Sequence, residues 1–361
     1  MTCTARHKPA VAARQRGGAT LFMATIVMFL VTIVTLYANK GGAFEQKMSG
    51  NHYMATQAFK AAQAGIDYSI AWLSTAGNPN GAAWKIPAGT TGAVWVSDNS
   101  YSPYNQKNTS SIAGQTIGNY AVNVTLWRNA SRPTVIEIVS SANGDASSTI
   151  RQIVNVLTLS FDVPTVAPLV VNGSISGVTG NPDITGADAA GNAVVSSAAP
   201  GNIDMGHMNY TGNVVANGFT GTAWDYLFGI SKSDMATIAN YQSGGPTAGP
   251  IYYYDDTTVS NYQPASIGTS SNPVILVFDI TSGSCPKING GKTIYGIVYC
   301  GQGFDMQGWG GTTIYGSLVI DTNLTKFTAN TNLGSNTNAN NPSSYSATPI
   351  VTRIIGSWRD F

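Results

Sequence analysis

Hydrophobic positions divide the chain into parts with different periodicities, and the first part has the character of a helix. Residues 19–39 contain no charge, and a helix of that length spans roughly 30 Å, the thickness of a bilayer core. After Gly41 and Gly42, which are expected to loosen or kink the helix, apolar residues recur at helical spacing as far as Leu73. Asn78-Pro79 is predicted to end the helix. We expect its second half to lie on the protein's own core and its first half to pack against other subunits.

The pattern changes to period two between Val122 and Ser160. Three apolar and polar alternations, NVTLWRN, TVIEIVSS and STIRQIVNVLTLSF, are separated by the turn-rich connectors NASRP and ANGDAS. Such spacing is typical of an antiparallel meander. Two prolines between Val163 and Pro168 mark a domain boundary. A long helix followed by this meander predicts an α+β unit.

An internal repeat organises the C-terminal part. GGKTIYG from Gly290 returns as GGTTIYG from Gly310 at an offset of 20 residues, and the same register gives apolar strands starting at Val274, Ile294 and Ile314. Equally spaced apolar strands favour a β-solenoid, in which each rung buries its face on the next. A duplicated β-meander is the alternative.

Two other segments carry local signals. Ser231 to Met235 predicts a helix N-terminus before ATIANY. The Asn-rich run at 329–344 is predicted to be a mobile loop.

Composition indicates the cellular compartment and the class of partner. Only 10% of the 361 residues are charged, while 40 are glycine, a bias that favours extracytoplasmic β structure rich in turns. Four basic residues, Arg6, Lys8, Arg14 and Arg16, precede residue 19, and the remainder has 14 basic against 17 acidic residues. Because the body is weakly acidic and has no basic stripe, contact with nucleic acid is not expected.

Two of the three cysteines form an even pair in the body. Cys3 lies among the basic N-terminal residues, whereas Cys285 and Cys300 lie in a glycine-rich region. One disulfide in an oxidising compartment is the preferred interpretation. Two buried free thiols are the alternative.

The N-terminal segment is predicted to be retained. A cleavable secretory signal has a shorter apolar region followed by small residues, whereas this run continues into a second helical pattern. The preceding basic residues place the N-terminus in the cytoplasm.

Chemical motifs are scarce. The sequence contains three histidines and none of the HExxH, CxxC, GxSxG, Walker or EF-hand patterns, so no catalytic residue, cofactor or metal is predicted. Asp255-Asp256 after three tyrosines, and Asp204 near His207, could act on polysaccharide. A solvated acidic turn beside strand aromatics is the favoured interpretation.

Several short stretches resemble one family. Gly18 followed by ATLFM is similar to the start of type IV pilins, which have a basic leader ending in glycine and a long apolar helix. RQRGGATLF, EQKMSGN (residues 45–51) and QAFKAAQAGIDYSIAWL (residues 57–73) resemble the N-terminal signature of PilX-type minor pilins. The closing GSWRDF (residues 356–361) resembles the ends of such proteins. The resemblance covers about the first 75 residues.

The resemblance implies processing at a defined bond. Prepilin peptidase would cut between Gly18 and Ala19, and the new amino group of Ala19 would be methylated. Major pilins carry glutamate at the fifth mature position, where this chain has Met23. An intramembrane carboxylate persists only where it has a partner, so its loss suits a rare subunit at the fibre tip. Met23 could also be simply a better membrane residue.

These inferences predict four regions: a leader at 1–18, an apolar and amphipathic helix at 19–76, a pilin-like antiparallel sheet at 77–164, and a β-rich domain at 165–361. The leading hypothesis is a minor pilin that is held in the bacterial inner membrane with its body in the periplasm, and then joins the pilus at the cell surface. Its expected partners are prepilin peptidase, other minor and major pilins, the assembly platform, and a tip adhesin or an external surface. The alternatives are a membrane-anchored polysaccharide-binding protein or enzyme, and a type II secretion pseudopilin.

Overall fold

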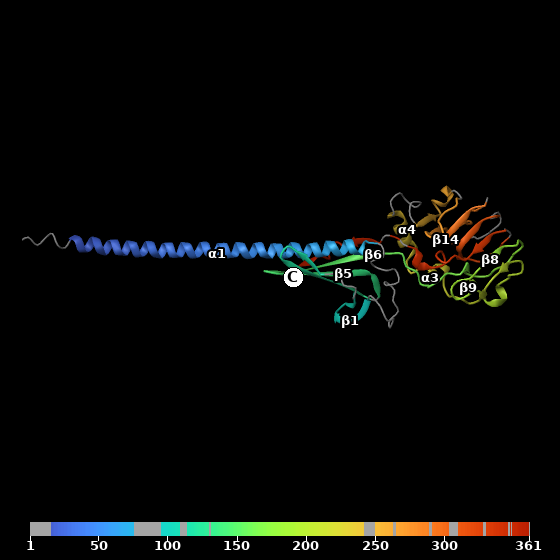
Figure 1. Ribbon diagram of the computed structural model, residues 1–361, viewed down its shortest axis with the longest axis horizontal. Helices are drawn as coiled ribbons and strands as arrows, with labels where there is room; N and C mark the ends of the chain where they lie inside the picture. Colours follow the sequence, from blue (N-terminus) through green and yellow to red (C-terminus); the bar gives the residue numbers. More distant parts are fainter. Residues whose placement is uncertain are drawn as a thin grey trace, which may run out of the picture.

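The computed structural model describes residues 16–75, 95–108, 114–129, 131–241, 250–262, 265–288, 291–302, 310–327, 330–345, 347 and 349–360. They form a long helix, an antiparallel sheet beside its C-terminal half, and a second β-rich unit at the opposite end of the molecule from the helix N-terminus (Figure 1). The predicted α+β fold is confirmed.

The first element is α1 (Arg16–Leu73), a helix of 58 residues and roughly 87 Å at 1.5 Å per residue. The prediction of a kink at Gly41 and Gly42 was wrong, because α1 is one continuous helix that runs straight along its length (Figure 1). A Cβ added at either glycine would meet nothing within 4 Å, so no neighbouring group bends the helix there. The helix ends at Leu73, before Asn78-Pro79, which lies outside the described residues.

The sheet beside α1 is antiparallel. Its strands in chain order are β1 (Trp95–Tyr101), β2 (Tyr104–Asn108), β3 (Gln115–Ile117), β4 (Tyr120–Asn129), β5 (Arg132–Asn143) and β6 (Ser147–Leu157). The last three are the predicted meander, with continuous antiparallel pairing. Alternate residues, among them Ile136, Ile138 and Ile150, are fully buried in the core shared with α1. The period-two pattern therefore marks the face that packs on the helix.

The end of the chain returns to this first sheet. β17 (Ile350–Arg353) and β18 (Arg359–Asp360) both pair antiparallel with β6, although the sequence placed residues 165–361 together in the C-terminal domain. Strands this short carry too few residues to show a periodicity. The second β-rich unit is consequently an insertion between β6 and β17, and the C-terminus lies beside α1 (Figure 1).

In the second unit every described pair of strands is parallel. The strands are β7 (Leu169–Val171), β8 (Asp183–Thr185), β9 (Asn192–Ser196), β10 (Asn209–Tyr210), β11 (Asn213–Val215), β12 (Ile251–Asp255), β13 (Val274–Asp279), β14 (Thr293–Cys300), β15 (Thr313–Ile320) and β16 (Asn332–Gly334). From β12 to β16 successive strands pair with one another, whereas from β7 to β11 each strand pairs with the next but one, and parallel stacking of this kind is the arrangement of a β-solenoid.

The solenoid consists of two stacks of strands, each in chain order. One stack contains β7, β9 and β11, and the other contains β12, β13, β14 and β15. The two stacks meet where β7 pairs with β15. The chain therefore enters at the middle of the stack and winds to one end. It then passes through α3 (Ala223–Leu227) and α4 (Lys232–Tyr241) and winds back from the other end. Both connections to the antiparallel sheet consequently leave from the middle of the stack.

The sequence repeat occupies equivalent places in neighbouring rungs. Thr293 pairs with Thr313, an offset of 20 residues, but Val274 pairs with Gly296, an offset of 22, so the spacing is not equal throughout. The glycine that recurs in the two IYG repeats has a structural cause, because Gly296 and Gly316 have φ values of 144° and 143°. A Cβ on Gly316 would lie 2.1 Å from the Gly296 carbonyl oxygen. Only glycine fits where the strand bends so close to the rung beneath.

The solenoid strands are buried on both faces. One set of side chains, including Leu276, Val298 and Leu318, fills the interior of the coil. The alternate set, including Ile275, Ile297 and Val319, packs against α3 and α4. Burial on both faces explains why these strands are continuous apolar runs.

Two local predictions had different outcomes. The helix start near Ser231 is confirmed, since the Ser231 hydroxyl accepts a hydrogen bond of 3.1 Å from the Asp234 amide at the start of α4. The mobile loop expected at 329–344 was wrong, because its described residues include β16 and a turn that buries Asn340. The Asn340 amide group donates to the Val166 and Gly316 carbonyls. The Asn340 side chain thus supplies hydrogen bonds that backbone amides would otherwise donate to these carbonyls.

Candidate assembly surface and the predicted sites

The predicted processing site lies in the first turn of α1. Gly18 and Ala19 are exposed, and Met23 is 66% exposed. The helix begins at Arg16, so the bond between Gly18 and Ala19 is helical. Residues 1–15, with most of the basic leader and Cys3, lie outside the described residues.

The first half of α1 presents apolar side chains on all sides. Leu21, Phe22, Phe29, Val34 and Tyr37 are each more than 60% exposed. The described residues contain one helix that is long and apolar enough to cross a membrane, and this is the segment concerned. Such a surface is stable only in lipid or against other apolar surfaces.

The hydroxyl groups in this segment are satisfied within the helix. Thr25, Thr32 and Thr35 each donate a 2.7 Å hydrogen bond to the carbonyl four residues earlier. A hydroxyl paired in this way enters hydrocarbon at little cost. The segment is therefore suited to a bilayer or to an apolar protein interface.

The second half of α1 lies on the sheet through small residues. Ala58, Ala61 and Ala62 are at most 2% exposed. A Cβ on Gly65 would lie 2.2 Å from Ser140 Oγ and 2.7 Å from Val122 Cγ1. The AAQAG element thus allows the helix backbone to approach the strands closely. Sequence reasoning found this element by resemblance but did not assign it this contact.

The C-terminal segment fastens α1 to β6. Trp358 makes an edge-to-face contact with Phe59 at 5.8 Å, and Arg353 forms an ion pair with Asp67. Ser357 Oγ accepts a 2.7 Å hydrogen bond from Gln152 Nε2 on β6. The GSWRDF ending, noted in the sequence only as a resemblance, therefore holds the helix against the sheet.

The predicted disulfide is present. Cys285 and Cys300 are bonded, with their Cα atoms 6.1 Å apart and a sequence separation of 15. Both are buried in the coil interior, so the bond fastens the turn after β13 to the end of β14.

The acidic residues suspected of chemistry serve turns. Asp255 Oδ1 accepts hydrogen bonds from the amides and hydroxyls of Thr257 and Thr258, which lower the pKa of Asp255 to about 2. Asp256 accepts from the amide and hydroxyl of Thr281, and these bonds lower its pKa as well. A catalytic acid would require a raised pKa. Among the described residues there is also no group of three metal-ligating side chains.

A partly buried polar network joins α4 to the solenoid. Asp279 accepts 2.7 Å and 2.5 Å hydrogen bonds from Lys232 and Tyr253, and Tyr299 donates a 2.7 Å hydrogen bond to Asp321. Burial and the adjacent carboxylates raise the pKa of both tyrosines. All the partners are internal, so this network stabilises the fold and presents no open site.

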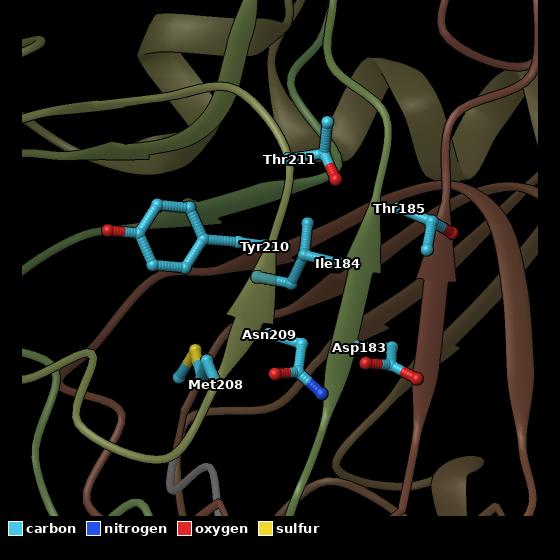
Figure 2. Close-up of a pocket in the computed structure, with 7 residues that line it drawn as sticks. All are labelled: Asp183, Ile184, Thr185, Met208, Asn209, Tyr210 and Thr211. Atoms are coloured by element: carbon cyan, nitrogen blue, oxygen red, sulfur yellow. The ribbon is translucent and has the colours of Figure 1, made fainter.

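One pocket of about 310 Å³ lies at the end of the solenoid where β8 and β10 pair. Figure 2 shows Asp183 and Asn209 side by side on these strands, with Tyr210 and Thr211 next to them. Sequence reasoning did not single out these residues, because no motif marks two short strands far apart in the chain.

The helix and its sheet define the class of protein: an α+β protein with a long N-terminal helix, whose first half is apolar and exposed and whose second half packs on an antiparallel sheet. Residues 16–67 match the family model described as PilX N-terminal. The chain therefore carries a PilX-type N-terminal segment, as its sequence resemblance indicated.

Two further comparisons add little. No curated protein matches the chain. Among solved structures, the competence-associated pilin ComZ from Thermus thermophilus matches with 10% identity, over 85% of this chain and 97% of that chain, at a TM-score of 0.30. A likeness this low transfers no property to this chain.

Proposed function

We propose that this protein is a minor pilin of a type IV pilus. The observation that carries the proposal is the division of α1, most of which matches the PilX N-terminal model. The apolar side chains of its first half have no cover within the described chain, whereas its second half is buried on the protein's own sheet. One helix thus links a membrane or fibre environment to a folded body.

In this proposal prepilin peptidase removes residues 1–18 on the cytoplasmic face, and the amino group of Ala19 is methylated. Residues 19–39 hold the protein in the inner membrane with its body in the periplasm. The same residues later pack among the helices of other minor and major pilins, after the assembly platform draws the subunit into the fibre.

Met23 bears on the position in the fibre. A subunit without a carboxylate at the fifth mature residue cannot pair with the amino terminus of a neighbour. The solenoid lies at the end of the molecule opposite to the helix N-terminus (Figure 1), so its bulk would be accommodated best at or near the tip. There it would be presented to a tip adhesin or to an external surface.

Blocking the cleavage tests the proposal. In cells producing Gly18→Leu, the protein should keep its leader and surface piliation should fall, whereas Gly17→Leu is the matched control and should be processed. Normal processing and piliation in the Gly18 variant would refute the assignment. The secretion pseudopilin alternative shares this leader chemistry, and it would be favoured if the protein were processed normally but protein secretion, and not piliation, failed on deletion.

A further inference from the structure

One outer face of the solenoid carries a row of unused polar groups beside an aromatic surface. Parallel pairing aligns Thr313, Asn332, Asp183 and Asn209 on consecutive strands. The residues between them, Ile314, Leu333 and Ile184, are fully buried. Because side chains alternate along a strand, the first set points outward.

A tyrosine stack lies in the adjoining row. The rings of Tyr295 and Tyr315 stack with centroids 4.8 Å apart and planes 21° apart. The next rung has Gly334 in this row, and a Cβ there would lie 3.0 Å from the Tyr315 ring. The missing side chain gives the Tyr315 ring room beside Gly334, and Tyr315 is 37% exposed, so part of this side chain is open to solvent in the row next to the polar one.

The polar row ends in the pocket of about 310 Å³ seen in Figure 2. The side chains of Asp183, Asn209 and Asn332 have no hydrogen-bond partner among the described residues. Other acidic side chains of the solenoid do have partners: Asp188 and Asp255 accept hydrogen bonds from amides of their own turns, and Asp256 accepts one from the Thr281 amide. The polar groups of this face are thus available to a ligand, whereas those of the turns are not.

We propose that this face binds a neutral glycan. An exposed aromatic ring offers a flat apolar surface to the C–H face of a sugar, and carboxylate and amide groups bind its hydroxyls. The face has one carboxylate and no cationic residue along the rows from Tyr295 to Asn209. This charge disfavours nucleic acid and anionic polysaccharide, and the shallow, polar lining offers little to an apolar peptide side chain.

The ligand is expected to be extended. From Tyr315 through β16 and β8 to β10 the face crosses three rung spacings, or roughly 14 Å at about 4.8 Å each, which is longer than one sugar ring. A chain of several sugars could therefore stack on Tyr315 and reach the pocket. Glycan binding is a function additional to the proposed minor-pilin role. It rests on that role only because a pilin would expose the solenoid outside the cell.

The test uses the full-length protein in lipid nanodiscs and isothermal titration calorimetry. The probes are cellohexaose, maltohexaose and chitohexaose as neutral chains, hexagalacturonate as an anionic chain, and a single-stranded DNA oligonucleotide. At least one neutral chain should bind saturably, and the two anionic probes should bind more weakly or not at all. Failure of all three neutral chains, or preference for an anionic probe, would overturn the proposal.

Variants locate the binding. Tyr315→Ala should weaken it about tenfold, equivalent to about 1.4 kcal/mol, and Asp183→Asn, which keeps the shape of the side chain, should weaken it several-fold. Tyr315→Phe keeps the ring, and Tyr68→Ala removes a tyrosine of similar exposure from α1 (42%); both should bind like the unchanged protein. Unaltered affinity in both Tyr315→Ala and Asp183→Asn would also refute the assignment. The calorimetry measures only affinity, so a negative result leaves the minor-pilin proposal intact. Likewise, normal processing and piliation in the Gly18 variant would refute the minor-pilin proposal without affecting the glycan result.

Discussion

Gly65 is the position where adding one methyl group tests most sharply how α1 is held on its sheet. The new Cβ of Gly65→Ala would lie 2.2 Å from Ser140 Oγ and 2.7 Å from Val122 Cγ1, well inside van der Waals contact. Replacing glycine by alanine within a helix ordinarily stabilises by about 1 kcal/mol, whereas overpacking a core costs about 1–3 kcal/mol. We therefore expect the substitution to be destabilising, by up to about 2 kcal/mol.

Gly50 is the matched control. It lies in the same helix, and a Cβ there would meet nothing within 4 Å, so Gly50→Ala should stabilise by roughly 0.5–1 kcal/mol. Ser140→Ala removes the closest atom. The Ser140 hydroxyl is buried and makes no hydrogen bond to the described residues, so its loss should cost little. In that background Gly65→Ala should be less harmful, which a double-mutant cycle would detect as coupling.

Hydrogen exchange of β4–β6 in detergent micelles, read by mass spectrometry, reports the opening free energy of this unit alone. Gly65→Ala should accelerate exchange in β5, where Ser140 lies, and Gly50→Ala should not. The reasoning would be refuted if both alanines slowed exchange equally, or if Ser140→Ala made no difference to the Gly65 variant.

Further predictions concern the solenoid. Gly316 has a φ of 143°, so Gly316→Ala should destabilise the solenoid by about 2 kcal/mol or more, the sum of backbone strain and overpacking. Gly310 has open space around it, so the control Gly310→Ala should leave the urea midpoint nearly unchanged. Cys285→Ser should lower the free energy of unfolding by about 3 kcal/mol for a loop of this length, and adding a reductant should then have no further effect. Hydrogen bonds hold the pKa of Asp255 at about 2, below its usual 3.8. The Asp255 carboxylate therefore makes its full contribution to the free energy of unfolding above the usual pKa, and this contribution is lost as the pH falls towards 2. Asp255→Ala should accordingly lower the urea midpoint at pH 6 but not at pH 2.

The elements with a strong repeating signal could be predicted. The helix, the β4–β6 meander and the strands from Val274, Ile294 and Ile314 follow from periodicity, because burial of one or both faces imposes it on the sequence. The Cys285–Cys300 bond followed from counting cysteines in a glycine-rich region that was predicted to be exported. The split of α1 into an exposed and a buried half also followed, from the absence of a nearby partner for its first half.

Other features depend on contacts between distant residues and left no local signal. The return of β17 and β18 to the first sheet rests on backbone pairing with β6, which any short strand could make. The Asn-rich run was taken for a loop by composition, but Asn340 satisfies carbonyls of two distant segments. The glycine pair in α1 was expected to kink the helix, yet propensity alone did not break a helix whose residues on both sides favour continuation. The pocket between β8 and β10 arises only from the solenoid winding.

Mass spectrometry of the N-terminal peptide of this protein, recovered from sheared pili, tests the minor-pilin assignment most directly. We predict that the protein is present at low abundance relative to the main subunit, and that its N-terminal peptide begins ATLFM with a methylated amino group on Ala19. Absence from the pili, or a chain that retains the residues before Ala19, would contradict the assignment.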